Sequence, residues 1–156
     1  MHEVLERVVA LIASEHREAV KLIRDYDPSL PPLSADPDQL MQALLNITRN
    51  AVQSIAQDGH VIFRTRALTN FPIGAIRHKL VLSIEIEDNG PGVPADLAEP
   101  IFYPLVTGRP DGTGLGLPIS QDLVSRHGGL IEYQSRPGRT VFTVRLPAVA
   151  PAPEVA

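Results

Sequence analysis

Hydrophobic and polar positions alternate most strictly along residues 80–87. One side of this run is wholly apolar and consists of Leu80, Leu82, Ile84 and Ile86. A period of two predicts a β-strand that packs this face on a core. One step further along the same face lies Asp88. Because an unpaired buried carboxylate is costly, Asp88 is expected to have a polar partner.

A glycine-rich turn, Asp88-Asn89-Gly90-Pro91-Gly92, follows this strand directly. Glycines let the backbone approach another group closely. An acid at the inner end of a strand, beside exposed backbone donors, suits recognition of a flat, hydrogen-bonding ligand such as a nucleobase. Taken alone, the turn is explained equally well as a polar strand end followed by an ordinary loop.

A helix is predicted from Pro37 to about Ile55, with Asp36 as its N-cap and Pro37 at its first position. Its apolar positions share one broad face at about 100° per residue. That face comprises Leu40, Leu44, Ile47, Ala51 and Ile55, extended by Met41, Thr48 and Val52.

The opposite face of this helix carries Asn46, Asn50 and Gln53, which lie within about 60° of one another. Asn is a poor residue for a helix interior, because its amide competes with backbone hydrogen bonding. Two Asn residues on one line therefore need a reason, which is either exposure to solvent or contact with a ligand.

The other elements follow from the same patterns and from Gly and Pro punctuation. In the first half of the chain they are a helix over 2–14, a strand over 20–26, a proline-rich link to Pro32, and strands over 60–68 and 79–88 around a loop at 70–74. In the second half they are a short helix over 95–102, a mobile loop over 103–114, a helix ending at His127, strands over 130–134 and 140–146, and an unstructured tail. The helix ending at His127 is expected to have Ile119, Leu123 and Val124 on its apolar side.

Composition narrows the class of protein. The 156 residues suggest one domain, with 44% hydrophobic and 21% charged residues. No apolar run is long enough to span a bilayer, and the chain contains no Cys, which fits a cytoplasmic location. The net charge of −4 and the aromatic content of 4% argue against a nucleic-acid partner.

A second glycine cluster, Gly112-Thr113-Gly114-Leu115-Gly116-Leu117, opens the helix that ends at His127. A helix N-terminus preceded by glycines offers unpaired N–H groups and a favourable dipole to phosphate. Arg109 is the only cation within residues 103–114. A glycine cluster alone is a weak signal, but after an Asn-bearing helix and an acidic glycine turn it points strongly to a nucleotide.

In this order the motifs resemble the catalytic ATP-binding domain of sensor histidine kinases, in the superfamily that also holds the gyrase, Hsp90 and MutL ATP-binding domains. The similarity covers roughly residues 17–147. The family's N box matches Asn46-Ile47-Thr48-Arg49-Asn50-Ala51, its first glycine box matches residues 88–92, its phenylalanine box matches Ile101-Phe102-Tyr103-Pro104-Leu105 and its second glycine box matches residues 112–117. Residues 101–109, with Val4-Leu5-Glu6-Arg7-Val8, look most like the nitrogen-regulation kinases of the NtrB type.

The resemblance implies an α/β two-layer sandwich, in which a mixed sheet of about five strands carries three helices on one face (the Bergerat-type ATP-binding fold). It also implies a division of the chain. Residues 1–16 would be a helical lead-in from a dimerisation and phosphoacceptor domain, residues 17–147 the ATP-binding domain, and residues 148–156 a disordered tail.

The resemblance also assigns roles to residues. Asp88 would accept a hydrogen bond from the adenine amino group, and Asn50 would act in catalysis by coordinating the Mg²⁺ that bridges the phosphates. Arg109 would lie on the γ-phosphate side. The other expected nucleotide-binding residues are Asn46 beside the phosphates, Gly90 and Gly92 around the base, Phe102, Gly112, Thr113, Gly114, Leu115, Gly116 and Leu117 in or near the lid, and Thr140 near the adenine.

The implied activity is that of a histidine kinase that uses Mg-ATP and releases ADP. Such kinases phosphorylate a His within a His-Glu-x-x-Asn-Pro motif, which this sequence lacks, so its five histidines are interpreted as structural or surface residues. The chain is therefore expected to bind ATP without phosphorylating itself. Expected partners are its own dimerisation and phosphoacceptor domain, a response regulator of the NtrC type and a regulatory protein of the PII type.

Three alternatives remain open. A hydrolytic ATPase of the gyrase or MutL kind would carry a Glu general base four residues before the metal-binding Asn, where this chain has Asn46. A switch kinase that phosphorylates Ser of a partner protein is a second relative. A catalytically silent nucleotide-binding module is the third, because Thr107-Gly108-Arg109 departs from the commoner Thr-Thr-Lys of related kinases.

Overall fold

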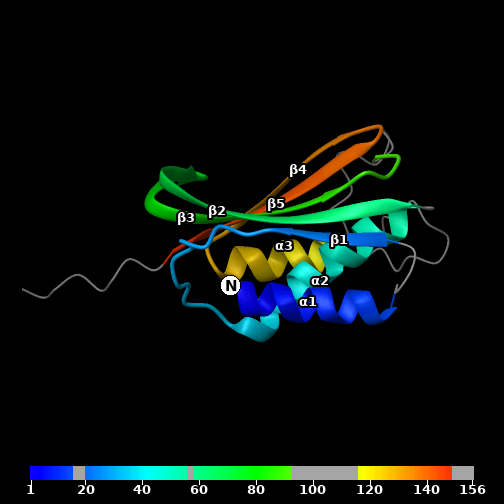
Figure 1. The fold of residues 1–156 in the computed structure, drawn as a ribbon. Helices are drawn as coiled ribbons and strands as arrows, with labels where there is room; N and C mark the ends of the chain where they lie inside the picture. The colour runs from blue at the N-terminus through cyan, green and yellow to red at the C-terminus, as the bar shows by residue number, and fades with distance from the viewer. Residues whose placement is uncertain (16–19, 56–57, 93–115, 149–156) are drawn as a thin grey trace, which may run out of the picture.

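The computed structural model describes residues 1–15, 20–55, 58–92 and 116–148. The described elements, in chain order, are the helices and strands α1 (His2–Glu15), β1 (Val20–Asp25), α2 (Pro37–Ser54), β2 (Gly59–Ile73), β3 (Ile76–Asp88), α3 (Gly116–Arg126), β4 (Leu130–Arg136) and β5 (Arg139–Pro147). The three helices lie together on one face of a single sheet (Figure 1). The predicted two-layer sandwich is confirmed. The short helix and loop predicted over 95–114, and the tail, lie outside the described residues.

The sheet has five strands in the order β1-β2-β3-β5-β4. β1 pairs with β2 in parallel, whereas every other neighbouring pair is antiparallel. The sheet is therefore mixed, as the sequence resemblance implied. In this register Asp88, at the end of β3, lies opposite Thr140 at the start of β5.

α2 begins where the sequence predicts. The carboxylate of Asp36 accepts hydrogen bonds from the backbone N–H groups of Asp38 (3.0 Å) and Gln39 (3.2 Å), and Pro37 is the first helical residue. These bonds satisfy two of the donors that every helix N-terminus leaves unpaired. The helix ends at Ser54, within one residue of the prediction.

One hydrophobic core joins the three helices to the sheet. Its largest fully buried side chains are Phe63, Phe142, Leu5, Ile12, Leu44, Ile47, Leu82, Ile84, Ile86 and Leu146. α1 contributes five buried residues to this core, so it packs as part of the same unit. The role of residues 1–16 as a lead-in from another domain stays a prediction.

His127 ties the end of α3 to the entrance of α2. Its Nδ1 donates to the carbonyl of Leu123 (2.8 Å), and its Nε2 accepts from the backbone N–H of Asp36 (3.1 Å). The ring therefore bridges two helix termini that are far apart in the sequence. This contact is structural, in line with the interpretation of the histidines.

The prediction of a loop at residues 70–74 is wrong for most of that range. β2 continues to Ile73 and β3 starts at Ile76, so the two strands form one long hairpin that turns at Gly74, where φ is 59°. Pro72 is compatible with a strand here, because β1 pairs with β2 only as far as Arg64 and leaves that edge of β2 open.

The apolar side predicted for α3 is partly wrong. Leu123 and Val124 are buried as expected, but Ile119 is 37% exposed. The buried positions of the first turns are instead Leu117 and Ser120. The Ser120 hydroxyl is satisfied there by carbonyl oxygens, at 2.9 Å from Ala43 of α2 and 3.0 Å from Gly116.

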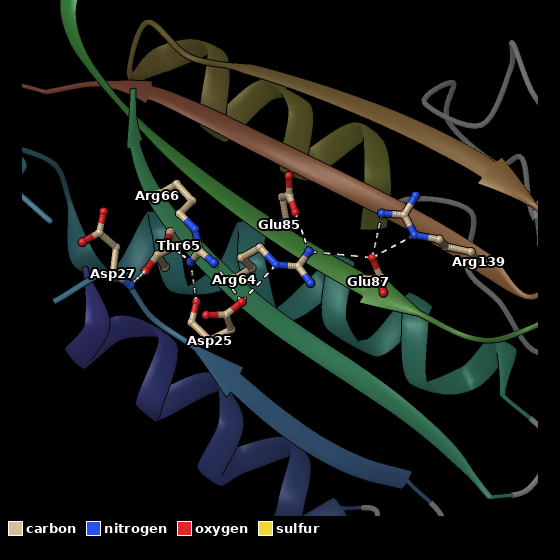
Figure 2. A network of polar contacts seen from close by, with 8 residues as sticks. All are labelled: Asp25, Asp27, Arg64, Thr65, Arg66, Glu85, Glu87 and Arg139. Carbon is tan, nitrogen blue, oxygen red and sulfur yellow. Dashed lines mark hydrogen bonds and ion pairs between the residues drawn. The ribbon is translucent and has the colours of Figure 1, made fainter. Parts of the chain in front are cut away.

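Charged residues cover the sheet face that points away from the helices (Figure 2). Arg64 on β2 forms ion pairs with Asp25 on β1 (3.2 Å) and Glu85 on β3 (2.7 Å), and Arg139 on β5 contacts Glu87 on β3 (2.9 Å). Because successive strand residues point to opposite faces, Glu87 faces outward where Asp88 faces the helices. Arg64 also lies 3.7 Å from Glu87, so the network joins four strands. Its end at Glu87 and Arg139 lies behind Asp88 and Thr140.

We expect Glu87→Gln to lower the free energy of unfolding by roughly 1–3 kcal/mol, because the substitution removes the charge partner of Arg139 from a site where the Glu87 side chain is only 13% exposed. Glu132→Gln is the matched control, since the Glu132 side chain is 53% exposed and should contribute less than about 1 kcal/mol. Urea unfolding measures both values. Equal losses would contradict this ranking.

Candidate functional site

Asp88 is the buried centre of the candidate site, with only 3% of its surface exposed. Its Oδ1 accepts a hydrogen bond from the backbone N–H of Gly90 (2.9 Å) and one from the Ser54 hydroxyl (3.3 Å). The polar partners predicted for this carboxylate are therefore present. Within the described part of the chain, no hydrogen bond ends on Oδ2. One carboxylate oxygen is thus held by the protein, and the other accepts no hydrogen bond from the described residues.

Burial dominates the electrostatics of Asp88. Burial raises the pKa of the Asp88 carboxyl, whereas the hydrogen bonds from Gly90 and Ser54 lower it by a smaller amount. The charged form is thus less favoured here than on a surface. A ligand that donates a hydrogen bond to the carboxylate would stabilise this form.

The turn after Asp88 needs its glycines for space. A Cβ on Gly90 would lie 2.8 Å from Ser54 Oγ and 3.1 Å from the Ser54 carbonyl oxygen. Gly92 has φ 92°, and a Cβ there would lie 3.0 Å from the carbonyl oxygen of Arg136. The backbone N–H of Gly138 also donates to the Gly90 carbonyl (3.0 Å). The turn is therefore packed between the end of α2 and the β4–β5 turn.

Thr140 lies beside Asp88 on the next strand, as their register pairing requires. Thr140 is 4% exposed, and its Oγ1 is 2.8 Å from Ser135 Oγ on β4. The structure thus places Thr140 opposite Asp88 on the neighbouring strand, and its expected place near the adenine stays a prediction.

α2 connects Asp88 to the start of α3. Asn46 and Asn50 are half-buried along one line of the helix, and the Asn46 amide donates to the carbonyl of Gly116 (3.4 Å). Ser54 continues the same line and contacts Asp88. These positions, at i, i+4 and i+8, span about 12 Å of helix. The line therefore connects the Asp88 turn to the start of α3.

Sequence reasoning missed Ser54 and placed Gln53 on the polar line, but Gln53 is exposed. The available signal was the four-residue spacing from Asn50. Gly116 and Leu117 are placed at the start of α3. The other predicted site residues Phe102, Arg109, Gly112, Thr113, Gly114 and Leu115 lie outside the described residues, so their roles stay predictions.

Comparison with known proteins decides the family. Residues 35–150 match the family described as histidine kinase-, DNA gyrase B- and HSP90-like ATPases. The chain belongs to this family. The matched range includes the Asn-bearing helix α2, the Asp88 turn and Thr140.

Among individual relatives, the sensory histidine kinase/phosphatase NtrB of Klebsiella oxytoca is 50% identical over 94% of this chain. The NtrB of Rhodobacter capsulatus is 42% identical over 97% of it. The chain spans 42–43% of the length of these curated relatives. This ATPase-family domain is therefore similar to the corresponding part of NtrB histidine kinases.

Solved structures agree with this assignment. The nucleotide-free catalytic domain of histidine kinase ThkA is 25% identical, with a TM-score of 0.80, and the match covers 95% of this chain and 92% of that one. Full-length ShkA in complex with AMPPNP is 29% identical, with a TM-score of 0.78, over 97% of this chain and 31% of that one. The domain thus shares its fold with catalytic domains of histidine kinases.

Two glycines of the site should respond differently to an added methyl group. Gly90→Ala should lower the free energy of unfolding by about 1–3 kcal/mol, because its Cβ would overlap the last turn of α2. Gly116→Ala should cause no loss, because among the described residues the nearest atom to its Cβ would be Asn46 Cβ at 3.7 Å. Thermal unfolding of both variants checks this, and an unaffected Gly90→Ala variant would contradict the packing described for the turn.

Proposed function

We propose that this domain binds Mg-ATP along the polar line of α2 and donates the γ-phosphate to a histidine on a separate dimerisation domain. Two hydrogen bonds carry the proposal. Ser54 contacts Asp88 at one end of that line, and Asn46 contacts Gly116 at the other end. The base would bind at Asp88 and the phosphates would lie toward α3.

The chemistry of Asp88 fits adenine. A buried carboxylate with one oxygen held by the protein offers its other oxygen to a single donor, which the exocyclic amino group of adenine supplies. The close packing of Gly90 against α2 leaves backbone rather than side chain beside the base. The complex of ShkA with AMPPNP, an ATP analogue, supports a nucleotide ligand for a domain of this fold.

Asn50 is the proposed Mg²⁺ ligand. Mg²⁺ prefers oxygen ligands and is commonly bound by one or two side chains together with substrate phosphates. Within the described residues there is no cluster of three or more His, Asp or Glu side chains that would hold a metal alone. A single amide oxygen between Asn46 and Ser54 fits a metal that arrives with the nucleotide.

Phosphoryl transfer requires mainly positioning and charge neutralisation. The chain's own residues would orient the base through Asp88 and position the phosphates near Asn46 and the start of α3. Arg109, outside the described residues, would neutralise charge on the γ-phosphate. The bound Mg²⁺ would supply further neutralisation between the phosphates.

The similarity to NtrB supports a role in nitrogen-regulation signalling in the cytoplasm. The partners we propose are the protein's own phosphoacceptor domain, a response regulator of the NtrC type and a PII-type regulatory protein. No helix among the described residues is long and apolar enough to cross a membrane.

A hydrolytic ATPase is less well supported. Asn46, which stands where such enzymes carry a Glu base, cannot take a proton from water, and its amide donates to Gly116. The two functions are separated by supplying labelled ATP with and without the purified phosphoacceptor domain. Label on the acceptor histidine supports the kinase, whereas rapid phosphate release from this domain alone would favour the ATPase.

Asp88→Asn should reduce ATP affinity by roughly ten- to a hundredfold, because the adenine amino group loses a charged acceptor worth about 1.5–3 kcal/mol. Without nucleotide, the variant should be at least as stable to heat as the parent, because burial raises the pKa of Asp88 and so opposes its charge. Calorimetric titration with ATP measures the first effect, and thermal unfolding measures the second. Unchanged ATP affinity would contradict the role of Asp88 at the base.

Asn50→Ala should abolish Mg²⁺-dependent autophosphorylation of the full-length kinase, since the metal loses its protein ligand. Gln53→Ala is the control, because Gln53 is exposed on the same part of α2. Incorporation of label from ATP measures both variants. Full activity of the Asn50→Ala variant would refute the metal assignment.

A further inference from the structure

The hydroxyl of Ser54 lies between two acceptors at the end of α2. It is 2.7 Å from the carbonyl oxygen of Ala51 and 3.3 Å from Asp88 Oδ1. A serine hydroxyl has one proton to donate. The proton can therefore serve the helix or the carboxylate, and a change in the charge of Asp88 alters which acceptor is favoured.

The contact is closely packed. Asp88 is 3% exposed, and the nearest atoms to a Cβ built on Gly90 would be Ser54 Oγ at 2.8 Å and Asp88 Oδ1 at 3.0 Å. Ser54 and Asp88 thus leave no space for a side chain on Gly90. The Oδ1 side of the carboxylate is occupied by two protein donors, and Oδ2 is the side left for a ligand.

We propose that Ser54 is a positioning residue that determines nucleotide specificity: by donating to Oδ1, it keeps Asp88 a charged acceptor and so favours purines with a 6-amino group over purines with a 6-oxo group. This inference rests on the proposed function, because it assigns the base selectivity of the same site.

The chemical reason is the difference between a carboxylate and a carboxylic acid. A carboxylate only accepts hydrogen bonds, which suits the amino group of adenine, whereas a protonated carboxyl can also donate to the oxygen of a 6-oxopurine. Burial raises the pKa of Asp88, and the Ser54 hydrogen bond opposes that rise. Loss of the hydroxyl therefore favours the protonated form.

Other groups act on Asp88 as well. Among the described residues, Glu87 on β3 raises its pKa and His60 on β2 lowers it. The neighbouring strand β5 contributes the uncharged Thr140, and α2 contributes the uncharged Ser54. Substitution of Ser54 leaves both charged neighbours in place, so its effect on the titration of Asp88 can be measured separately.

The test compares the parent chain with Ser54→Ala and Ser54→Thr, titrated with ATP and with inosine triphosphate from pH 5 to 8.5. For Ser54→Ala we expect ATP to bind about three- to tenfold more weakly near neutral pH, with a smaller effect on inosine triphosphate. Because the ionised carboxylate is the stronger acceptor, ATP affinity should fall as the pH is lowered. That fall should begin at a higher pH in Ser54→Ala than in the parent, and Ser54→Thr, which keeps the hydroxyl, should restore the parent profile.

A purely structural role for Ser54 would weaken both nucleotides equally and leave the pH profile in place, and that result would overturn the inference. In an Asp88→Asn background, Ser54→Ala should leave the ratio of the affinities for ATP and inosine triphosphate unchanged, because the carboxylate to which Ser54 is coupled is gone. A further change in that ratio would also overturn it. If the parent chain binds ATP and only these differences are missing, the Ser54 inference alone fails. If the parent binds no ATP at all, the proposed function fails with it.

Discussion

The burial of one carboxylate against the last turn of α2 is the constraint on which the site depends. Asp88 continues the apolar face of β3, so the strand that supplies much of the core also brings an ionisable group into it. A buried charge is tolerated only with hydrogen-bond partners. Ser54 and the Gly90 backbone provide them on one oxygen, and this arrangement orients the other.

α2 has a double role because its two sides face different environments. One side buries Leu44, Ile47 and Ala51 in the core. The other carries Asn46, Asn50 and Ser54, which reach from the start of α3 to the end of β3. The packing that fixes α2 on the sheet therefore also fixes the distance between the two ends of the proposed nucleotide site. His127 adds a second attachment by holding the entrance of α2 to the end of α3.

The charged face of the sheet supports the site from behind. Glu87 and Asp88 are neighbours on β3 but point to opposite faces, and Arg139 and Thr140 show the same relation on β5. The ion pair between Glu87 and Arg139 on the outer face thus lies behind Asp88 and Thr140 on the inner face. A register shift between the two strands would break both arrangements together, because a slip of one residue exchanges the faces.

The sequence by itself determined the features that depend on local chemistry and periodicity. The start of α2 follows from Asp36 and Pro37, and the burial of Asp88 follows from strict alternation in β3. The order of the motifs was enough to predict the family and the sandwich, both of which the structure and the comparisons confirm. These signals are short in range, so a single chain displays them directly.

Only the tertiary structure decided which side chains meet across the fold. Ser54 contacts a carboxylate 34 residues away, and nothing in the period of α2 indicates what lies opposite its last turn. The extended β2–β3 hairpin depends on pairing between strands and on the open edge beside Pro72, whereas composition alone favoured a loop. Ile119 is exposed because the placement of α3 against α2 favours Leu117 and Ser120 as its inner positions. Periodicity specifies the face of an element, but the partner of that face is set by packing between distant segments.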